Sequence, residues 1–223
     1  MEASIKRVNR SREAARASYN RLSRWYDVIA GSTEKKYRDG GLEKLSAQPG
    51  ERILEIGFGT GHCLVALAKA VGSTGQVIGL DISDGMLAVA QQRLQTEKLS
   101  DRAILHLGDA ANLNFIPSTS LDGIFMSFTL ELFDTPEIPR VLQECYRVLK
   151  LGGRLVVVTM TKTDPPGMAV RLYEWFHEQM PDYADCRPIF ARQALEQNGF
   201  VIEDGSVSSM WGLPVEIILG RKS

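Results

Sequence analysis

The sequence predicts an α/β fold with a doubly wound, mostly parallel sheet. Short apolar runs alternate with helix-length amphipathic segments along the 223 residues, and this alternation is typical of that class. The run at 153–160 is rich in valine, as expected of a strand buried on both faces. A third observation is the apolar run at 51–56, which ends in closely spaced glycines and leads directly into a helical pattern. These three features predict a sheet with helices on both faces.

The periodicity of each segment gives the expected elements in chain order. Helices are expected near 5–29, 33–46, 61–71, 84–97, 135–149, 167–179 and 189–198. Seven strands are expected near 51–56, 76–80, 102–107, 121–126, 153–160, 200–207 and 214–220. The last two strands are expected to pair antiparallel, and Gly152 and Gly153 are expected to close the preceding helix with a left-handed cap.

Length and composition indicate a single domain over 1–223, with a helical cap or lid at 1–46 and a substrate-side insertion at 161–188. A hydrophobic content of 44% allows a sizeable core, and a net charge of −1 gives no electrostatic reason for nucleic-acid binding. No apolar run is long enough to span a membrane. The three cysteines, Cys63, Cys145 and Cys186, lack metal-ligand spacing. We therefore expect no metal and a reduced, cytoplasmic setting.

Three alternate glycines, Gly57, Gly59 and Gly61, follow the 51–56 strand. Glycine tolerates positive φ and lets a ligand approach bare backbone, and the following helix start adds N–H groups. The turn therefore predicts a nucleotide-type cradle. A nicotinamide-binding enzyme would show G-x-G-x-x-G instead. An acid at the next strand tip, here Asp81, suits the ribose of any adenosine ligand and does not separate the two alternatives.

The glycine pattern together with Glu55 resembles the first motif of class I S-adenosylmethionine-dependent methyltransferases. This resemblance implies a Rossmann-like fold and S-adenosylmethionine as the cofactor, with the acid near its methionine end and Asp81 on its ribose. It extends over nearly the whole chain. It implies that Asp109 and Ala110 contact the adenine, that Ile82 adjoins the site, and that Phe128 packs on the methionine side. The segments that carry this resemblance are 53–61, 106–110, 121–127 and 147–158.

Within that family the chain is most similar to the quinone-biosynthesis C-methyltransferases and their small-molecule relatives. The Trp25-Tyr26-Asp27 stretch matches their N-terminal segment and makes Tyr26 a candidate cofactor contact. The basic helix around it has three open interpretations: a packed helix with a solvated face, a lid, or weak docking to an anionic membrane surface. The aromatic segment 161–188, which contains His177, is a candidate acceptor wall.

Glu131 is the main departure from the quinone enzymes, which carry an Arg-Asn pair where this chain has Glu131 and Leu132. Their C-terminal histidine is also replaced, by Val215-Glu216-Ile217. Glu131 is therefore a candidate base, a hydrogen-bond acceptor for substrate, or a surface charge. His177 is a second candidate, whereas His62 and His106 are expected to be a helix-start residue and a buried strand residue.

The expected activity is methyl transfer to a small, hydrophobic or aromatic acceptor by a monomer or homodimer. Quinone C-methylation is one alternative. A cofactor-binding regulatory protein without turnover is another, from a different class. Nucleic-acid methylation would need a pocket for a flipped base, and 127–130 (Ser-Phe-Thr-Leu) does not match one.

Overall fold

Seven strands form one sheet in the computed structural model, which describes residues 31–162, 167, 170, 171, 173 and 187–223. The strand order is β3-β2-β1-β4-β5-β7-β6. The strands are β1 (Arg52–Ile56), β2 (Gln76–Asp81), β3 (Ala103–Leu107), β4 (Leu121–Ser127), β5 (Leu149–Met160), β6 (Phe200–Met210) and β7 (Leu213–Lys222). Strands β1 to β5 pair in parallel, and β7 pairs antiparallel with both β5 and β6. The predicted doubly wound fold with its antiparallel end is confirmed.

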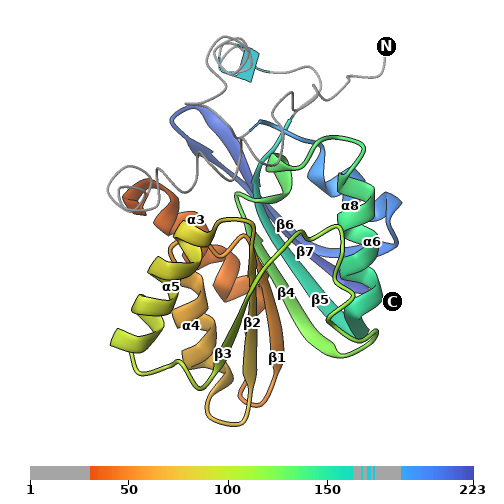
Figure 1. Cartoon of the computed structure of the whole chain (residues 1–223). Helices are drawn as coiled ribbons and strands as arrows, with labels where there is room; N and C mark the ends of the chain where they lie inside the picture. The colour runs from red at the N-terminus through yellow and green to blue at the C-terminus, as the bar shows by residue number, and fades with distance from the viewer. Residues whose placement is uncertain (1–30, 163–166, 168–169, 172, 174–186) are drawn as a thin grey trace.

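Helices cover both faces of the sheet, as Figure 1 shows. On one face lie α3 (Gly31–Leu45), α4 (His62–Val71) and α5 (Asp84–Thr96). On the other lie α6 (Ile138–Val148) and α8 (Ala191–Gln197), and a short 3₁₀ turn, η1 (Leu130–Leu132), follows β4. Each face has its own hydrophobic core. No helix in the described part of the chain is long and apolar enough to cross a membrane.

Helix α3 packs against the sheet through a glycine pair in its middle. A Cβ at Gly41 would lie 2.5 Å from Val158 Cγ2 and 2.9 Å from a ring carbon of Phe125. A Cβ at Gly40 would lie 3.0 Å from Ile217 Cδ1. Glycine here lowers helix propensity but allows the backbone to come close to β4, β5 and β7. The first turns of α3 are therefore held beside the carboxyl ends of the central strands.

The junction between α6 and β5 differs from the sequence prediction. Helix α6 ends at Val148, and its cap, Leu149, has extended dihedrals (φ −68°, ψ 140°) and already pairs with Leu121. Gly152 does have φ 75°, but it lies within β5 where the register with β4 shifts. The predicted glycine cap of the helix is wrong. The glycines form a bulge in the strand instead.

Most of the remaining predicted elements agree with the structure to within a few residues. Strands β6 and β7 extend beyond the predicted 200–207 and 214–220, because they continue together to the hairpin turn at Trp211 and Gly212. The predicted helix at 5–29 and most of the one at 167–179 lie outside the described residues.

Candidate active site

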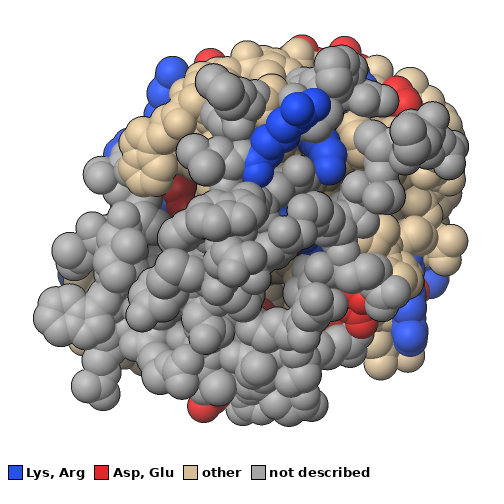
Figure 2. Space-filling model, turned by 90° about the horizontal axis from the view of Figure 1, so that it is seen from above, with Lys and Arg blue, Asp and Glu red and all other residues tan. Residues whose placement is uncertain are grey.

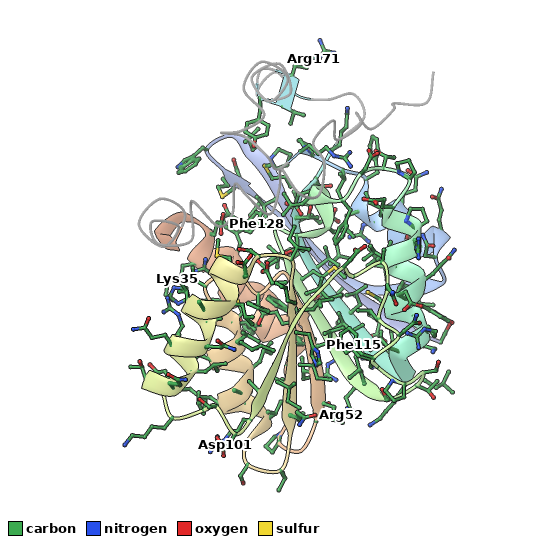
Figure 3. The ribbon with its side chains drawn as sticks, viewed as in Figure 1. Lys35, Arg52, Asp101, Phe115, Phe128 and Arg171 are labelled. Carbon is green, nitrogen blue, oxygen red and sulfur yellow. The ribbon has the colours of Figure 1, made fainter. Side chains whose placement is uncertain are left out.

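The candidate site lies at the carboxyl ends of the parallel strands. Figure 3 places Phe128, which follows β4, near the upper end of the sheet. It places Arg52, the first residue of β1, and Asp101, which precedes β3, near the lower end. The carboxyl ends of β1, β2 and β4 carry Glu55, Asp81 and Ser127, respectively. In open α/β sheets ligands bind at this edge, where the strand order reverses. Here the reversal falls between β1 and β4.

The three glycines of the β1–α4 turn all have positive φ, at 73°, 52° and 85° for Gly57, Gly59 and Gly61. A Cβ at Gly57 would lie 2.3 Å from Thr129 Oγ1, and one at Gly61 would lie 3.0 Å from Ala90 Cβ. These two glycines therefore allow close packing. Among the described residues, a Cβ at Gly59 would meet nothing within 4 Å. Bare backbone facing open space at this edge fits a bound ligand rather than a packing requirement.

The Asp81 carboxylate lies directly against that turn. Its Oδ2 accepts from Gly59 N at 2.9 Å, and its Oδ1 accepts from Ser83 N at 2.9 Å. Burial raises the pKa of Asp81, while backbone N–H groups of Ser83, Gly59 and Ile82 oppose that rise. Half-buried Ile82 thus adjoins the carboxylate. A fixed carboxylate at the tip of β2 can accept hydrogen bonds from two vicinal hydroxyl groups.

Glu55 is buried, and its Oε2 has no hydrogen-bond partner among the described residues. Burial raises its pKa well above the ordinary value, and the negative charge of Asp81 adds to the rise. The positive charge of Arg38 acts in the opposite direction. A buried carboxylate oxygen without a donor is unfavourable by itself. It suits a ligand that brings a cationic N–H group to the site.

Helix α3 contributes an ion pair to this region. Arg38 NH1 lies 3.5 Å from Glu34 Oε2, one helical turn away, and both side chains are mostly buried. Arg38 lowers the pKa of Glu55, and Glu34 raises that of Glu131. The pair therefore lies near both carboxylates. The sequence analysis missed these two residues, although their i, i+4 spacing on the predicted 33–46 helix was a signal.

Asp109 and Ala110 follow β3 at the same edge. Asp109 is half-buried and its Oδ1 accepts from Ala111 N at 2.9 Å, which closes a tight turn. Ala110 is buried in the core of the α6 face. The structure therefore brings both residues to the carboxyl edge of the sheet, beside the strand that ends in Asp81, and their expected contact with the adenine stays a prediction.

Phe128 begins an aromatic wall beyond β4. Its φ is 50°, a region that non-glycine residues rarely adopt, and its N–H donates to Val158 C=O at 2.7 Å. Its ring meets the ring of Tyr37 edge-on at 6.3 Å. Tyr37 in turn donates through its hydroxyl to Ser209 C=O at 2.6 Å. Strained backbone of this kind gathers at functional sites, and Tyr37 was not anticipated from the sequence.

Glu131 lies in η1 and is fully buried. Its Oε1 accepts from Met160 N at 3.2 Å, so the carboxylate takes the place of a strand partner just past the end of β4. Its Oε2 has no hydrogen-bond partner in the described part of the chain. Burial raises the pKa of Glu131 to about 7, against the opposing hydrogen bonds of Thr159 and Met160. The interpretation of Glu131 as a surface charge is therefore wrong.

The other candidates are distributed outside this cluster. His62 is exposed beside Arg93, and His106 is half-buried in β3 against the ring of Phe115, rather than fully buried as predicted. Tyr26 and His177 lie outside the described residues. Among the described residues no cluster of His, Cys, Asp or Glu could hold a metal ion. Seen from above, the described residues show acidic and basic side chains in small separate groups (Figure 2).

Comparisons with known proteins agree with this geometry. The sequence model of the ubiE/COQ5 methyltransferase family matches residues 5–196. A demethylmenaquinone methyltransferase from Desulfitobacterium hafniense (strain Y51) is 32% identical, covering 92% of this chain and 88% of its own. One of that name from Geobacillus sp. (strain WCH70) is 32% identical, covering 73% and 68%. The crystal structure of the cyclase SpnF shares the fold, with TM-score 0.77, 19% identity and 99% coverage of both chains.

Proposed function

The chain belongs to the ubiE/COQ5 methyltransferase family, and from that premise we propose how it works: it methylates a small, hydrophobic or aromatic metabolite. S-Adenosylmethionine supplies the methyl group on an activated sulfonium. The protein's part is to orient the two partners and exclude water, which accounts for much of the barrier reduction in such displacements. The open backbone at Gly59, with the Asp81 carboxylate hydrogen-bonded to it, is the observation that carries the proposal.

We assign the adenosine half of the cofactor to three places along the strand edge. Gly57, Gly59 and Gly61 provide the main-chain cradle beneath it. Asp81, with Ile82 beside it, accepts the ribose hydroxyl groups, and Asp109 with Ala110 contacts the adenine. Support comes from the three backbone N–H groups that hold Asp81 in a fixed position.

The methionine half has both an ammonium and a carboxylate group, and two charged side chains suit them. Glu55 has a buried oxygen without a donor among the described residues and can accept from the ammonium. Arg38 lies close enough to Glu55 to change its pKa and can pair with the carboxylate. Phe128 and, from the family resemblance, Tyr26 complete this end of the site.

The acceptor would lie beyond the methionine end, against the aromatic wall of Phe128 and Tyr37. Val170 and Tyr173, described residues of the 161–188 insertion, belong to the same hydrophobic core as that wall. We propose Glu131 as the proton acceptor and keep His177 as a second candidate. The relatives named demethylmenaquinone methyltransferase favour a quinol as one acceptor class.

Two measurements test this proposal. Isothermal titration calorimetry should show saturable binding of S-adenosylmethionine and S-adenosylhomocysteine, and no binding of a nicotinamide nucleotide. A panel of small aromatic acceptors, including menadiol, should give release of S-adenosylhomocysteine. Binding without turnover on any acceptor would favour the regulatory alternative, and turnover on RNA or DNA fragments would favour nucleic-acid methylation. Failure to bind either adenosyl compound would refute the assignment.

The remaining features of the proposal concern setting and organisation. Cys63 and Cys145 are buried free thiols, which supports a reducing, cytoplasmic location. We propose one catalytic domain, with 1–46 as a cap and 161–188 on the acceptor side, acting as a monomer or homodimer. Surface contact with an anionic membrane through the basic 5–29 segment is compatible with a hydrophobic acceptor.

A further inference from the structure

The acceptor side of the proposed site carries a carboxylate in apolar surroundings. Glu131 is fully buried, and Phe128, Met160 and Val158 are apolar residues at the same strand ends. Its Oε1 is occupied by the Met160 N–H, whereas Oε2 has no hydrogen-bond partner in the described part of the chain. An oxygen in this state is stabilised by an N–H or O–H donor. A bound substrate can supply that donor.

The charges around Glu131 decide which donor fits. From α3, the carboxylate of Glu34 acts on Glu131 and adds negative charge. Arg38 from the same helix is paired with Glu34 and acts on Glu55 instead. From β5, the neutral hydroxyl of Thr159 lowers the pKa of Glu131, while its own hydrogen bond goes to Met160 C=O at 3.3 Å. Before α8, the Arg187 guanidinium donates to Phe133 C=O at 2.6 Å and to Thr135 Oγ1 at 3.2 Å. Of these charged groups, Glu34 is the one that shifts the pKa of Glu131, and its negative charge favours a cationic donor over an anionic one.

The chemistry of the nucleophile gives the same answer. A phenol, quinol or thiol that gives its proton to Glu131 becomes an anion, so a negative charge stays in apolar surroundings near Glu34. An ammonium ion becomes neutral when Glu131 takes its proton, so the transfer removes both charges from those surroundings, which their low polarity favours. The edge-on aromatic pair of Tyr37 and Phe128 adds surfaces on which an ammonium can rest.

We propose that the acceptor is an amine on a small hydrophobic or aromatic skeleton, bound and deprotonated by Glu131. This inference rests on the proposed methyltransferase function and narrows its substrate class. The amine enters as an ammonium ion, and one N–H proton moves to Glu131 Oε2. The nitrogen lone pair then forms the N–CH3 bond while the C–S bond breaks, with its electron pair retained by sulfur. The products are the methylated ammonium ion, S-adenosylhomocysteine and a proton that Glu131 later gives to water.

The first test is equilibrium binding to protein saturated with S-adenosylhomocysteine, which requires no turnover. Phenethylamine and phenethyl alcohol share one skeleton and differ only in the donor group. Phenethylamine should bind at least about tenfold more tightly, and its affinity should rise between pH 6 and pH 8 as Glu131 ionises, since Glu131 has a pKa of about 7. The alcohol should show no such rise. Equal affinities without pH dependence would overturn the proposal.

The second test uses Glu131→Gln, which retains a carbonyl oxygen for the Met160 N–H and so preserves the local fold. The variant should lose the amine preference and at least about 100-fold of amine turnover, while its affinity for S-adenosylhomocysteine stays unchanged. Glu196→Gln, an exposed residue of α8, is the matched control and should behave as wild type. Faster methylation of menadiol than of the amine, with Glu131→Gln fully active, would refute the amine assignment but leave the methyltransferase function intact. Loss of adenosyl-ligand binding in the wild-type protein would instead contradict the proposed function itself.

Discussion

Asp81 Oδ2 accepts a hydrogen bond from the main-chain N–H of Gly59 at 2.9 Å. The contact joins the tip of β2 to the middle of the β1–α4 turn, so the carboxylate and the open backbone form one rigid unit. Gly57 N donates to Leu80 C=O at 2.7 Å and fixes the same turn from its other side. Ligand binding at this corner therefore depends on this fixed arrangement of carboxylate and main chain.

A side chain at Gly59 should prevent cofactor binding. Gly59→Val would project into the open space that we assign to the ligand, and we expect calorimetry to detect no binding of S-adenosylhomocysteine. The positive φ of 52° makes any side chain unfavourable there, by about 1–3 kcal/mol. Gly152→Val is the matched control, because Gly152 also has positive φ and a Cβ there would meet none of the described residues within 4 Å, but it lies in the β5 bulge. Both variants should lose stability, and only the first should lose binding.

Asp81→Asn should weaken every ligand that contains the adenosine ribose. The substitution keeps the size of the side chain but removes the negative charge and one acceptor oxygen. S-Adenosylhomocysteine and methylthioadenosine should both lose about 1.5–3 kcal/mol of binding free energy, the range for hydrogen bonds to a charged group. Calorimetry with the two ligands in parallel measures this. Unchanged affinity for both would show that the ribose lies elsewhere.

Arg38→Met should affect the binding of S-adenosylhomocysteine and methylthioadenosine differently. Methylthioadenosine lacks the amino-acid end, so its affinity should not change. S-Adenosylhomocysteine should lose about 1.5–3 kcal/mol, because the carboxylate loses a charged donor. The control is Lys35→Met on the same helix, since Lys35 forms an exposed ion pair with Asp39 and such pairs contribute little. Equal losses for both ligands would contradict the assignment of Arg38 to the carboxylate.

The positions that the sequence located correctly are those that follow from local pattern. Glu55 and Asp81 lie at the ends of strands that periodicity locates within one or two residues, and Gly59 lies in the turn after the first of them. Parallel strands then bring those ends together, because consecutive strand–helix–strand units repeat the same direction. Nothing beyond chain order was needed to place them at one edge.

Contacts that depend on packing could not be predicted in this way. Arg38 and Tyr37 reach the site because Gly40 and Gly41 let α3 approach the sheet closely, which periodicity does not encode. The burial of Glu131 depends on the N–H of Met160, which lies in the part of β5 that extends past the end of β4. The incorrect glycine cap has a similar cause, since the pairing of Leu149 with Leu121 ends α6 before the glycines.

Gly41→Ala should disturb both the packing of α3 and the cofactor site. A Cβ there would lie 2.5 Å from Val158 Cγ2, and overpacking of this kind destabilises a protein by about 1–3 kcal/mol. If α3 moves outward, Arg38 moves with it, and affinity for S-adenosylhomocysteine should fall more than affinity for methylthioadenosine. Gly167→Ala is the control, because a Cβ there would meet no atom of the described residues within 4 Å. A fully stable variant with unchanged binding would show that α3 tolerates the methyl group in place.

Glu131→Gln should stabilise the protein at high pH and leave it nearly unchanged at low pH. The folded protein holds a proton on Glu131 up to a pKa of about 7, whereas the unfolded chain loses it at the ordinary value near 4.3. As pH rises from about 4 to 8, the unfolded state therefore binds fewer protons than the folded state, and the stability of the wild-type protein falls by up to about 3 kcal/mol.

Glutamine carries no charge at any pH, so the Glu131→Gln variant lacks this pH-dependent loss of stability. Thermal unfolding at pH 4 and pH 8 should show a gain in Tm for the variant at pH 8 and almost none at pH 4, with roughly 2–4 °C per kcal/mol for a chain of this size. Burial also raises the pKa of Glu55, but that contribution is present in both proteins and cancels in the comparison. A variant that is equally or less stable than wild type at pH 8 would mean that Glu131 is ionised and fully solvated or paired in the folded protein, contrary to its burial.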